Sequence, residues 1–103
     1  MKDNKTRKTH KKLSSKGWSK QSPGTRERRI MKEHCGTKCF LGPIGESSFP
    51  ICSKDTCKIN PKGIYAAFVR SRQYLSKTNK QKYKKIANKS KKMLKKRGYF
   101  TFR

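Results

Sequence analysis

All four cysteines of this 103-residue chain lie between Cys35 and Cys57, and this cluster is the feature that most limits how the chain can fold. Only 30% of the residues are hydrophobic, whereas globular domains typically contain about 45–50% apolar residues. A chain of this size and composition can bury only a minimal core, so it needs a cross-link to be stable. The sequence therefore predicts one small folded domain organised around the cysteines.

Three chemical states of the cysteines fit the sequence. Successive cysteines are separated by three, twelve and four residues, a spacing that fits a structural zinc site loosely. Two disulfides are the second alternative, pairing Cys39 with Cys52 and Cys35 with Cys57, or crossed. No apolar stretch follows the basic N-terminus, so no secretory signal peptide is indicated, and a reducing compartment argues against disulfides. Free thiols are the third alternative.

In both cross-linked states, two apolar strings must cover the same small core. Phe40-Leu41 follows Cys39, and Phe49-Pro50-Ile51 precedes Cys52. We therefore expect Cys39 and Cys52 to lie close together, bridged either by a disulfide or by a metal ion.

The charge of the chain indicates its partner. Its formal net charge is +25, from 30 Lys and Arg residues against five Asp and Glu residues. None of the residues after Asp55 is acidic, whereas 16 of them are Lys or Arg. A chain of this kind repels itself and attracts polyanions such as nucleic acid. Lys outnumbers Arg, which suits point-charge contacts with phosphates better than bidentate recognition of bases.

Residues 1–31 differ in composition from the rest of the chain. They are rich in Lys, Arg, Ser and Thr and show no period of 3.6 or 2 residues, which predicts a disordered basic N-terminal arm. Trp18 is an isolated aromatic residue within this arm. The sequence leaves three roles open for Trp18: stacking on bases, anchoring in a protein groove, and simple exposure to solvent.

Residues 32–103 are predicted to form the folded domain, of a mainly α class. Its first part, a turn-rich cysteine region over 33–60, contains Xaa-Pro steps that disfavour helix. Two amphipathic helices follow, over about 61–76 and 80–97, and the short connection between them predicts an antiparallel helical hairpin. The expected fold is thus a small cysteine-stapled turn region packed on this hairpin.

The helix predictions depend on caps and on apolar periodicity. Asn60-Pro61 is a typical helix start, and Gly98 after a basic run is a typical helix end. Between them, small and apolar residues recur at steps of three and four, which predicts that they form the core face: Ile64, Ala67, Phe68, Ser71, Tyr74 and Leu75, then Tyr83, Ile86, Ala87, Ser90, Met93 and Leu94.

The second predicted helix contains an electrostatic conflict. Like charges recur at positions i and i+4 with no acidic residue to relieve them, in the pairs Lys80/Lys84, Lys85/Lys89, Lys91/Lys95 and Lys92/Lys96. At roughly 0.2–0.5 kcal/mol per pair, the four pairs disfavour the free helix by about 1–2 kcal/mol. A bound polyanion would reverse the sign of this contribution, which favours a nucleic-acid contact on this helix.

Four strings and a later triplet carry a resemblance to a known group of proteins: Cys39-Phe40-Leu41-Gly42-Pro43, Ser48-Phe49-Pro50-Ile51-Cys52, Cys57-Lys58-Ile59, Gly63-Ile64-Tyr65-Ala66-Ala67-Phe68-Val69-Arg70-Ser71-Arg72, and Tyr83, Ile86 and Ala87. Over residues 39–94 the chain resembles small basic, cysteine-containing proteins of nucleocytoplasmic large DNA viruses. The resemblance implies a virus-encoded, virion-packaged protein that handles or neutralises DNA. Such viruses encode thiol oxidases, so it also implies that disulfides can form without the secretory route.

These observations together predict a non-enzymatic nucleic-acid-binding protein that binds or condenses DNA through its phosphates, without strong sequence specificity. His10 and His34 are the only histidines, and neither pairs with a nucleophile in the sequence, which argues against catalysis. The alternative is a structural protein, either a minor capsid or virion component or a ribosomal-type RNA-binding protein. The expected location is the virion or the host nucleus or cytoplasm.

The expected partners are nucleic acid, with DNA favoured over RNA, and capsid or virion proteins. No run of about 18 apolar residues is present, so no membrane span is predicted. Zinc is the one cofactor that the cysteines leave open. The expected phosphate-binding residues are Lys11, Lys12, Arg28, Arg29, Arg70, Arg72, Lys80, Lys84, Lys85, Lys89, Lys91, Lys92, Lys95, Lys96 and Arg97.

Overall fold

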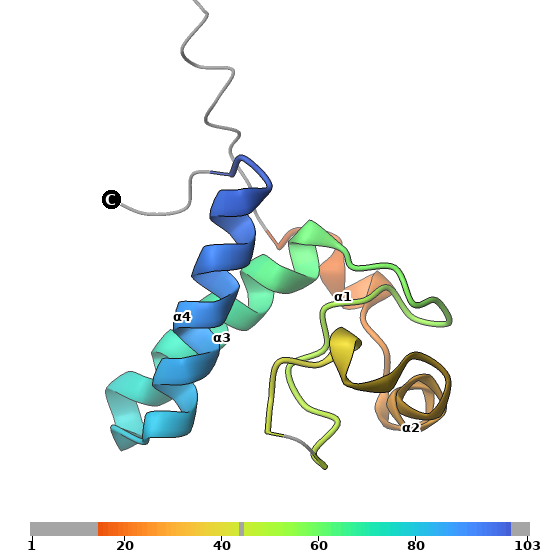
Figure 1. Ribbon diagram of the computed structural model, residues 1–103, viewed down its shortest axis with the longest axis horizontal. Coiled ribbons are helices and arrows are strands. Elements are labelled where there is room, and N and C mark those ends of the chain that lie inside the picture. The colour runs from red at the N-terminus through yellow and green to blue at the C-terminus, as the bar shows by residue number, and fades with distance from the viewer. Residues whose placement is uncertain (1–14, 44, 100–103) are drawn as a thin grey trace, which may run out of the picture.

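The structure, a computed structural model, describes residues 15–43 and 45–99, which are mainly helical (Figure 1). This part of the chain contains isolated bridges, Phe40 with Pro50 and Cys52 with Ile59, and no longer strand. The mainly α fold predicted from the sequence is confirmed. Its elements in chain order are α1 (Trp18–Gln21), α2 (Thr25–Cys35), the 3₁₀ helix η2 (Gly36–Cys39), α3 (Pro61–Thr78) and α4 (Gln81–Lys96).

The start and end of α3 follow from local sequence. The side chain of Asn60 accepts a hydrogen bond from the backbone N–H of Lys62 at 2.9 Å, and Pro61 occupies the first turn, where its missing N–H costs nothing. The helix ends at Asn79, which adopts a left-handed conformation with φ of 58°. The predicted helix over 61–76 is confirmed and continues to Thr78.

The C-terminal end of α4 has the hydrogen bonds of a Schellman motif. The N–H of Gly98 donates to the carbonyl of Lys95 at 3.0 Å, and the N–H of Tyr99 donates to that of Leu94 at 3.0 Å. Gly98 has φ of 82°, which a residue with a side chain rarely adopts. The second predicted helix is confirmed, with bounds at Gln81 and Lys96.

The two long helices form the predicted antiparallel hairpin (Figure 1). Ile64 and Phe68 of α3 pack with Ile86 and Leu94 of α4 in one buried cluster, which Leu41 and Ile51 of the cysteine region complete. Two serines on the inner faces are fully buried and small, and each donates its hydroxyl to its own helix: Ser71 to Phe68 O, and Ser90 to Ile86 O or Ala87 O. Tyr74, expected on this face, is 36% exposed instead.

The cysteines form two disulfides, Cys39–Cys52 and Cys35–Cys57, with Cα–Cα distances of 5.1 and 5.4 Å. The uncrossed pairing and the proximity of Cys39 to Cys52 are therefore confirmed. Cys39 and Cys52 are fully buried with Met31 and Phe40 in a second cluster, whereas Cys35 and Cys57 lie at its edge and are half-buried.

The predicted disordered arm is wrong for residues 15–31, because α1 and most of α2 lie there. Gly24 donates its backbone N–H to Glu27 Oε1 at 2.9 Å, which caps the start of α2. Met31 is the single fully apolar residue that α2 buries, so its apolar period is too weak to recognise. Residues 1–14 of the predicted arm lie outside the described residues.

Trp18 is buried against α3 and is only 8% exposed. Simple exposure to solvent, one of the alternatives that the sequence left open, is therefore wrong, because the Trp18 ring packs within its own chain against Gly63. Among the helices that the structure describes, none is long and apolar enough to cross a membrane.

Candidate nucleic-acid interface

The outward face of α4 carries a dense group of lysines. The 16 residues of α4 span about 24 Å, since each adds about 1.5 Å. Seven exposed lysines lie within this length, roughly one per 3.4 Å, which equals the spacing of phosphate charge along one strand of duplex DNA. We call these residues the lysine face: Lys84, Lys85, Lys89, Lys91, Lys92, Lys95 and Lys96.

The lysine face divides into two rows, because successive residues of a helix are about 100° apart. One row contains Lys84, Lys91 and Lys95, with Asn88 between them, and the other contains Lys85, Lys89, Lys92 and Lys96. Both rows lie on the side of α4 opposite its buried residues, so the face points away from α3. The structure thus brings together the predicted lysines of α4 on one surface.

The two ends of α4 extend the lysine face. Lys80, at the N-cap, and Arg97, at the C-cap, are both exposed. Lys95 and Lys96 occupy the last turn, where the helix dipole favours positive charge by about 0.3–1 kcal/mol. Arg97 Nη1 also donates to the carbonyl of Met93 at 3.5 Å.

Lys82 lies at the flank of α4 and differs from the lysine face. Its Nζ is 3.9 Å from Glu46 Oε2 and 5.2 Å from the centre of the Tyr83 ring. The two charged side chains of this ion pair are 40% and 50% exposed, so solvent screens it and it contributes little to stability. Lys82 was not among the predicted site residues, and no sequence pattern connects it to Glu46 in the cysteine region.

The predicted arginines of α2 and α3 lie apart from the lysine face, unlike Arg97 at the end of α4. Arg29 is exposed on α2, which lies on the opposite side of the molecule from α4 (Figure 1). Arg72 of α3 lies 5.5 Å from the centre of the Phe68 ring, in cation–π range. Lys11 and Lys12 lie outside the described residues. The predicted set is therefore not one surface.

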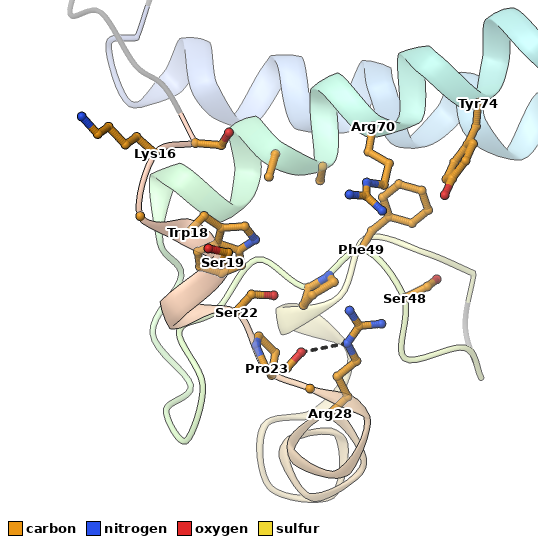
Figure 2. Close-up of a pocket in the computed structure, with 16 residues that line it drawn as sticks. Lys16, Trp18, Ser19, Ser22, Pro23, Arg28, Ser48, Phe49, Arg70 and Tyr74 are labelled. Atoms are coloured by element: carbon orange, nitrogen blue, oxygen red, sulfur yellow. Dashed lines mark hydrogen bonds between the residues drawn. The ribbon is translucent and has the colours of Figure 1, made fainter.

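Arg28 and Arg70 meet at a separate open groove of about 800 Å³ (Figure 2). α1, the start of α2, residues 48–50 and α3 form its walls. Figure 2 shows the two guanidinium groups entering the groove from opposite sides, Arg70 from α3 and Arg28 from α2. We call this site the arginine groove.

Two backbone carbonyls hold Arg28 in place. Its Nε donates to Pro23 O at 3.1 Å, and its Nη1 donates to Ser47 O at 3.3 Å. A guanidinium has five N–H donors, so three remain for a ligand. Arg70, by contrast, is exposed on α3 and makes no contact of this kind with the described part of the chain.

Three aromatic rings meet beside the arginine groove. Phe49 lies edge-on to Tyr74, with centroids 6.3 Å apart, and 6.1 Å from Tyr83, while Tyr74 and Tyr83 are 5.1 Å apart. Phe49 and Tyr74 also line the groove, where Figure 2 shows them beside Arg70. Sequence reasoning missed these residues as site residues. The string Phe49-Pro50-Ile51 was expected to cover the core, and Tyr74 matched the core period.

The described residues contain no cluster of three or more His, Cys, Asp or Glu side chains that could hold a metal ion. All four cysteines are engaged in disulfides, so none supplies a thiolate to zinc in this structure. Comparison with protein-family models, with curated proteins and with solved structures found no match to this chain.

Proposed function

We propose that this protein is a non-enzymatic nucleic-acid-binding protein that contacts the phosphates of duplex DNA through the lysine face, without strong sequence specificity. The single observation that carries the proposal is the charge density of that face, which matches the phosphate spacing of one DNA strand. The major groove of B-DNA is about 12 Å wide and admits a helix, so α4 fits beside the phosphate backbone that the lysine face contacts.

The composition of the face supports phosphate contact over base recognition. Lysine presents a flexible point charge, whereas sequence is read mainly by bidentate Arg, Asn or Gln side chains. On the outer side of α4, the exposed side chains suited to bidentate contact with a base are Gln81 and Asn88, against seven exposed lysines. The preference for DNA over RNA, a viral origin and a place in the virion or in the host nucleus or cytoplasm stay predictions that rest on the sequence.

The slope of affinity with salt tests the proposal. Log affinity for a duplex falls by about 0.9 per unit of log salt for each phosphate neutralised. Replacing Lys84, Lys85 and Lys92 with Gln is expected to flatten the slope by up to about three units and to weaken binding equally on unrelated sequences. The measurement is a titration of labelled duplexes by fluorescence anisotropy at several salt concentrations.

A variant of equal net charge is the matched control. Lys38, Lys54 and Lys58 are exposed in the cysteine region, away from α4, and their replacement with Gln removes the same charge. If both triple variants weaken binding equally, the chain binds DNA by net charge alone and α4 is not the interface. If neither changes a shallow slope, the lysine face contacts a protein instead, as in a minor capsid component.

A further inference from the structure

We infer that the arginine groove is a second nucleic-acid site, which binds an unpaired nucleotide by base stacking together with phosphate contacts. This inference rests on the proposed function and deepens it, because it adds single-stranded nucleic acid to the ligands of the chain. The inference is based on one observation: the guanidinium groups of an arginine from α2 and an arginine from α3 face the groove that Phe49 and Tyr74 also line.

The charge of the groove selects an anionic ligand. Among its described lining residues are Arg28 and Arg70, and none of these lining residues is acidic. Arg28 is held by the carbonyls of Pro23 and Ser47, so its free donors keep a fixed direction and little side-chain freedom is lost on binding. Arg70 is exposed with its guanidinium available, and Figure 2 shows it beside the Phe49 ring.

The aromatic side chains select a ligand with a flat ring. Phe49 is half-buried and Tyr74 is 36% exposed, so each presents part of its surface to the groove. Proteins that bind single strands combine a basic groove with aromatic residues on which bases stack. A volume of about 800 Å³ lies in the range of small-ligand sites, and the open form of the groove suits a chain that passes through it.

An acidic peptide satisfies only half of this arrangement. Its carboxylates pair with the arginines, but it offers no ring for Phe49 and Tyr74. A base on a duplex is also excluded, because paired bases are stacked on their neighbours and do not enter a side groove. The unpaired nucleotide is the ligand that uses both kinds of side chain.

The test compares two single strands of equal charge. One is an oligothymidylate of about eight nucleotides, and the other is an abasic deoxyribose-phosphate strand of the same length. Base stacking on aromatic residues typically strengthens binding by roughly 5- to 150-fold per base, so the native protein should bind the oligothymidylate more tightly by a factor in this range. Fluorescence anisotropy of end-labelled strands at one salt concentration measures both affinities.

Two variants test whether the preference for a strand with bases arises in the arginine groove. Tyr74→Leu keeps an apolar side chain of similar width and should remove most of the preference for bases, while Arg70→Gln should weaken binding of both strands. The matched control is Arg72→Gln, which removes an exposed arginine of α3 that does not line the groove. Because Arg70 and Arg72 are exposed, circular dichroism should show both Gln variants folded.

The outcomes separate this inference from the proposed function. In one outcome, the native protein binds the two strands equally while duplex binding still depends on the lysine face. That result overturns the inference that the groove binds an unpaired nucleotide, but it agrees with the proposed function. A base preference that survives Tyr74→Leu also overturns it, as does an Arg70→Gln variant that binds both strands as tightly as the native protein does. Absence of binding to any nucleic acid overturns both. If oligoglutamate displaces the oligothymidylate as well as an unlabelled copy does, the groove binds acidic peptides instead.

Discussion

At the scale of single residues, Gly63 decides how closely three segments approach. It is buried in α3, directly against the ring of Trp18 and the backbone of Ile51. A Cβ at position 63 would lie 2.6 Å from Trp18 Cη2 and 2.9 Å from Ile51 Cα, both closer than van der Waals contact allows. The absence of a side chain at this position therefore lets α1 and the cysteine region pack on the same turn of α3.

Gly63→Ala is expected to destabilise the protein although alanine favours helix. The gain in helix propensity is about 1 kcal/mol, whereas overpacking against ring and backbone atoms costs typically 1–3 kcal/mol. Trp18 is the only tryptophan, so its fluorescence emission should shift to longer wavelength as the ring moves into solvent. Ser76→Ala, at an exposed position of α3, is the control and should leave the emission unchanged. A higher Tm with unchanged emission would show that α3 accepts the methyl group.

At the scale of elements, the two disulfides have different tasks. Their sequence separations of 22 and 13 residues give similar loop-closure contributions, about 3 kcal/mol each by the chain-entropy estimate. The two disulfides therefore differ mainly in how deeply each is buried and in which segments each one joins. Cys39–Cys52 lies in the buried cluster beside Ile51, which enters the hairpin core, whereas Cys35–Cys57 is half-buried and ties the end of α2 to the loop that contains Thr56.

Replacing Cys35 and Cys57 with Ser should therefore release α2 while the hairpin stays folded. Amide hydrogen exchange is expected to accelerate over 25–35 and to change little in α3 and α4, since their shared apolar cluster contains no residue of α2. Replacing Cys39 and Cys52 with Ser should instead accelerate exchange in the cysteine region and in the hairpin. Equal acceleration everywhere in both variants would mean that the domain unfolds as one cooperative unit.

At the scale of the whole molecule, repulsion among like charges opposes folding. The net charge is +25, and the lysine face concentrates part of it on one helix without acidic neighbours on that helix. Salt screens such repulsion, with a Debye length of about 10 Å at 0.1 M. The folded state, which brings the charges together, should gain more from screening than the unfolded chain does.

We accordingly expect the Tm to rise as sodium chloride increases from low to moderate concentration. Circular dichroism at ~222 nm, a wavelength that reports helix, measures the Tm. The variant with Gln at positions 84, 85 and 92 should start from a higher Tm, because it lacks like-charge pairs at i and i+4 that cost roughly 0.2–0.5 kcal/mol each. Its Tm should also depend less on salt. A Tm that falls with salt in the native protein would show that favourable ion pairs outweigh the repulsion.

The sequence by itself determined α3 and α4, because the signals for these helices are local. Asn60-Pro61 begins one, Gly98 ends the other, and the period of their apolar residues lies within each helix. It also determined the lysine face, since residues three, four and seven apart share one side of a helix. The sequence did not predict α2, because Met31 is the residue that it buries and one apolar residue gives no recognisable period.

Only the tertiary structure decided the state of the cysteines and the existence of the arginine groove. Spacing allowed zinc as well as disulfides, and the choice required the Cα atoms of Cys39 and Cys52 to come within 5.1 Å. The groove combines Trp18, Arg28, Phe49 and Arg70 from four segments that no local pattern connects. Local signals specify a helix because its contacts span a few residues, whereas a site built across segments exists only once the core has brought them together.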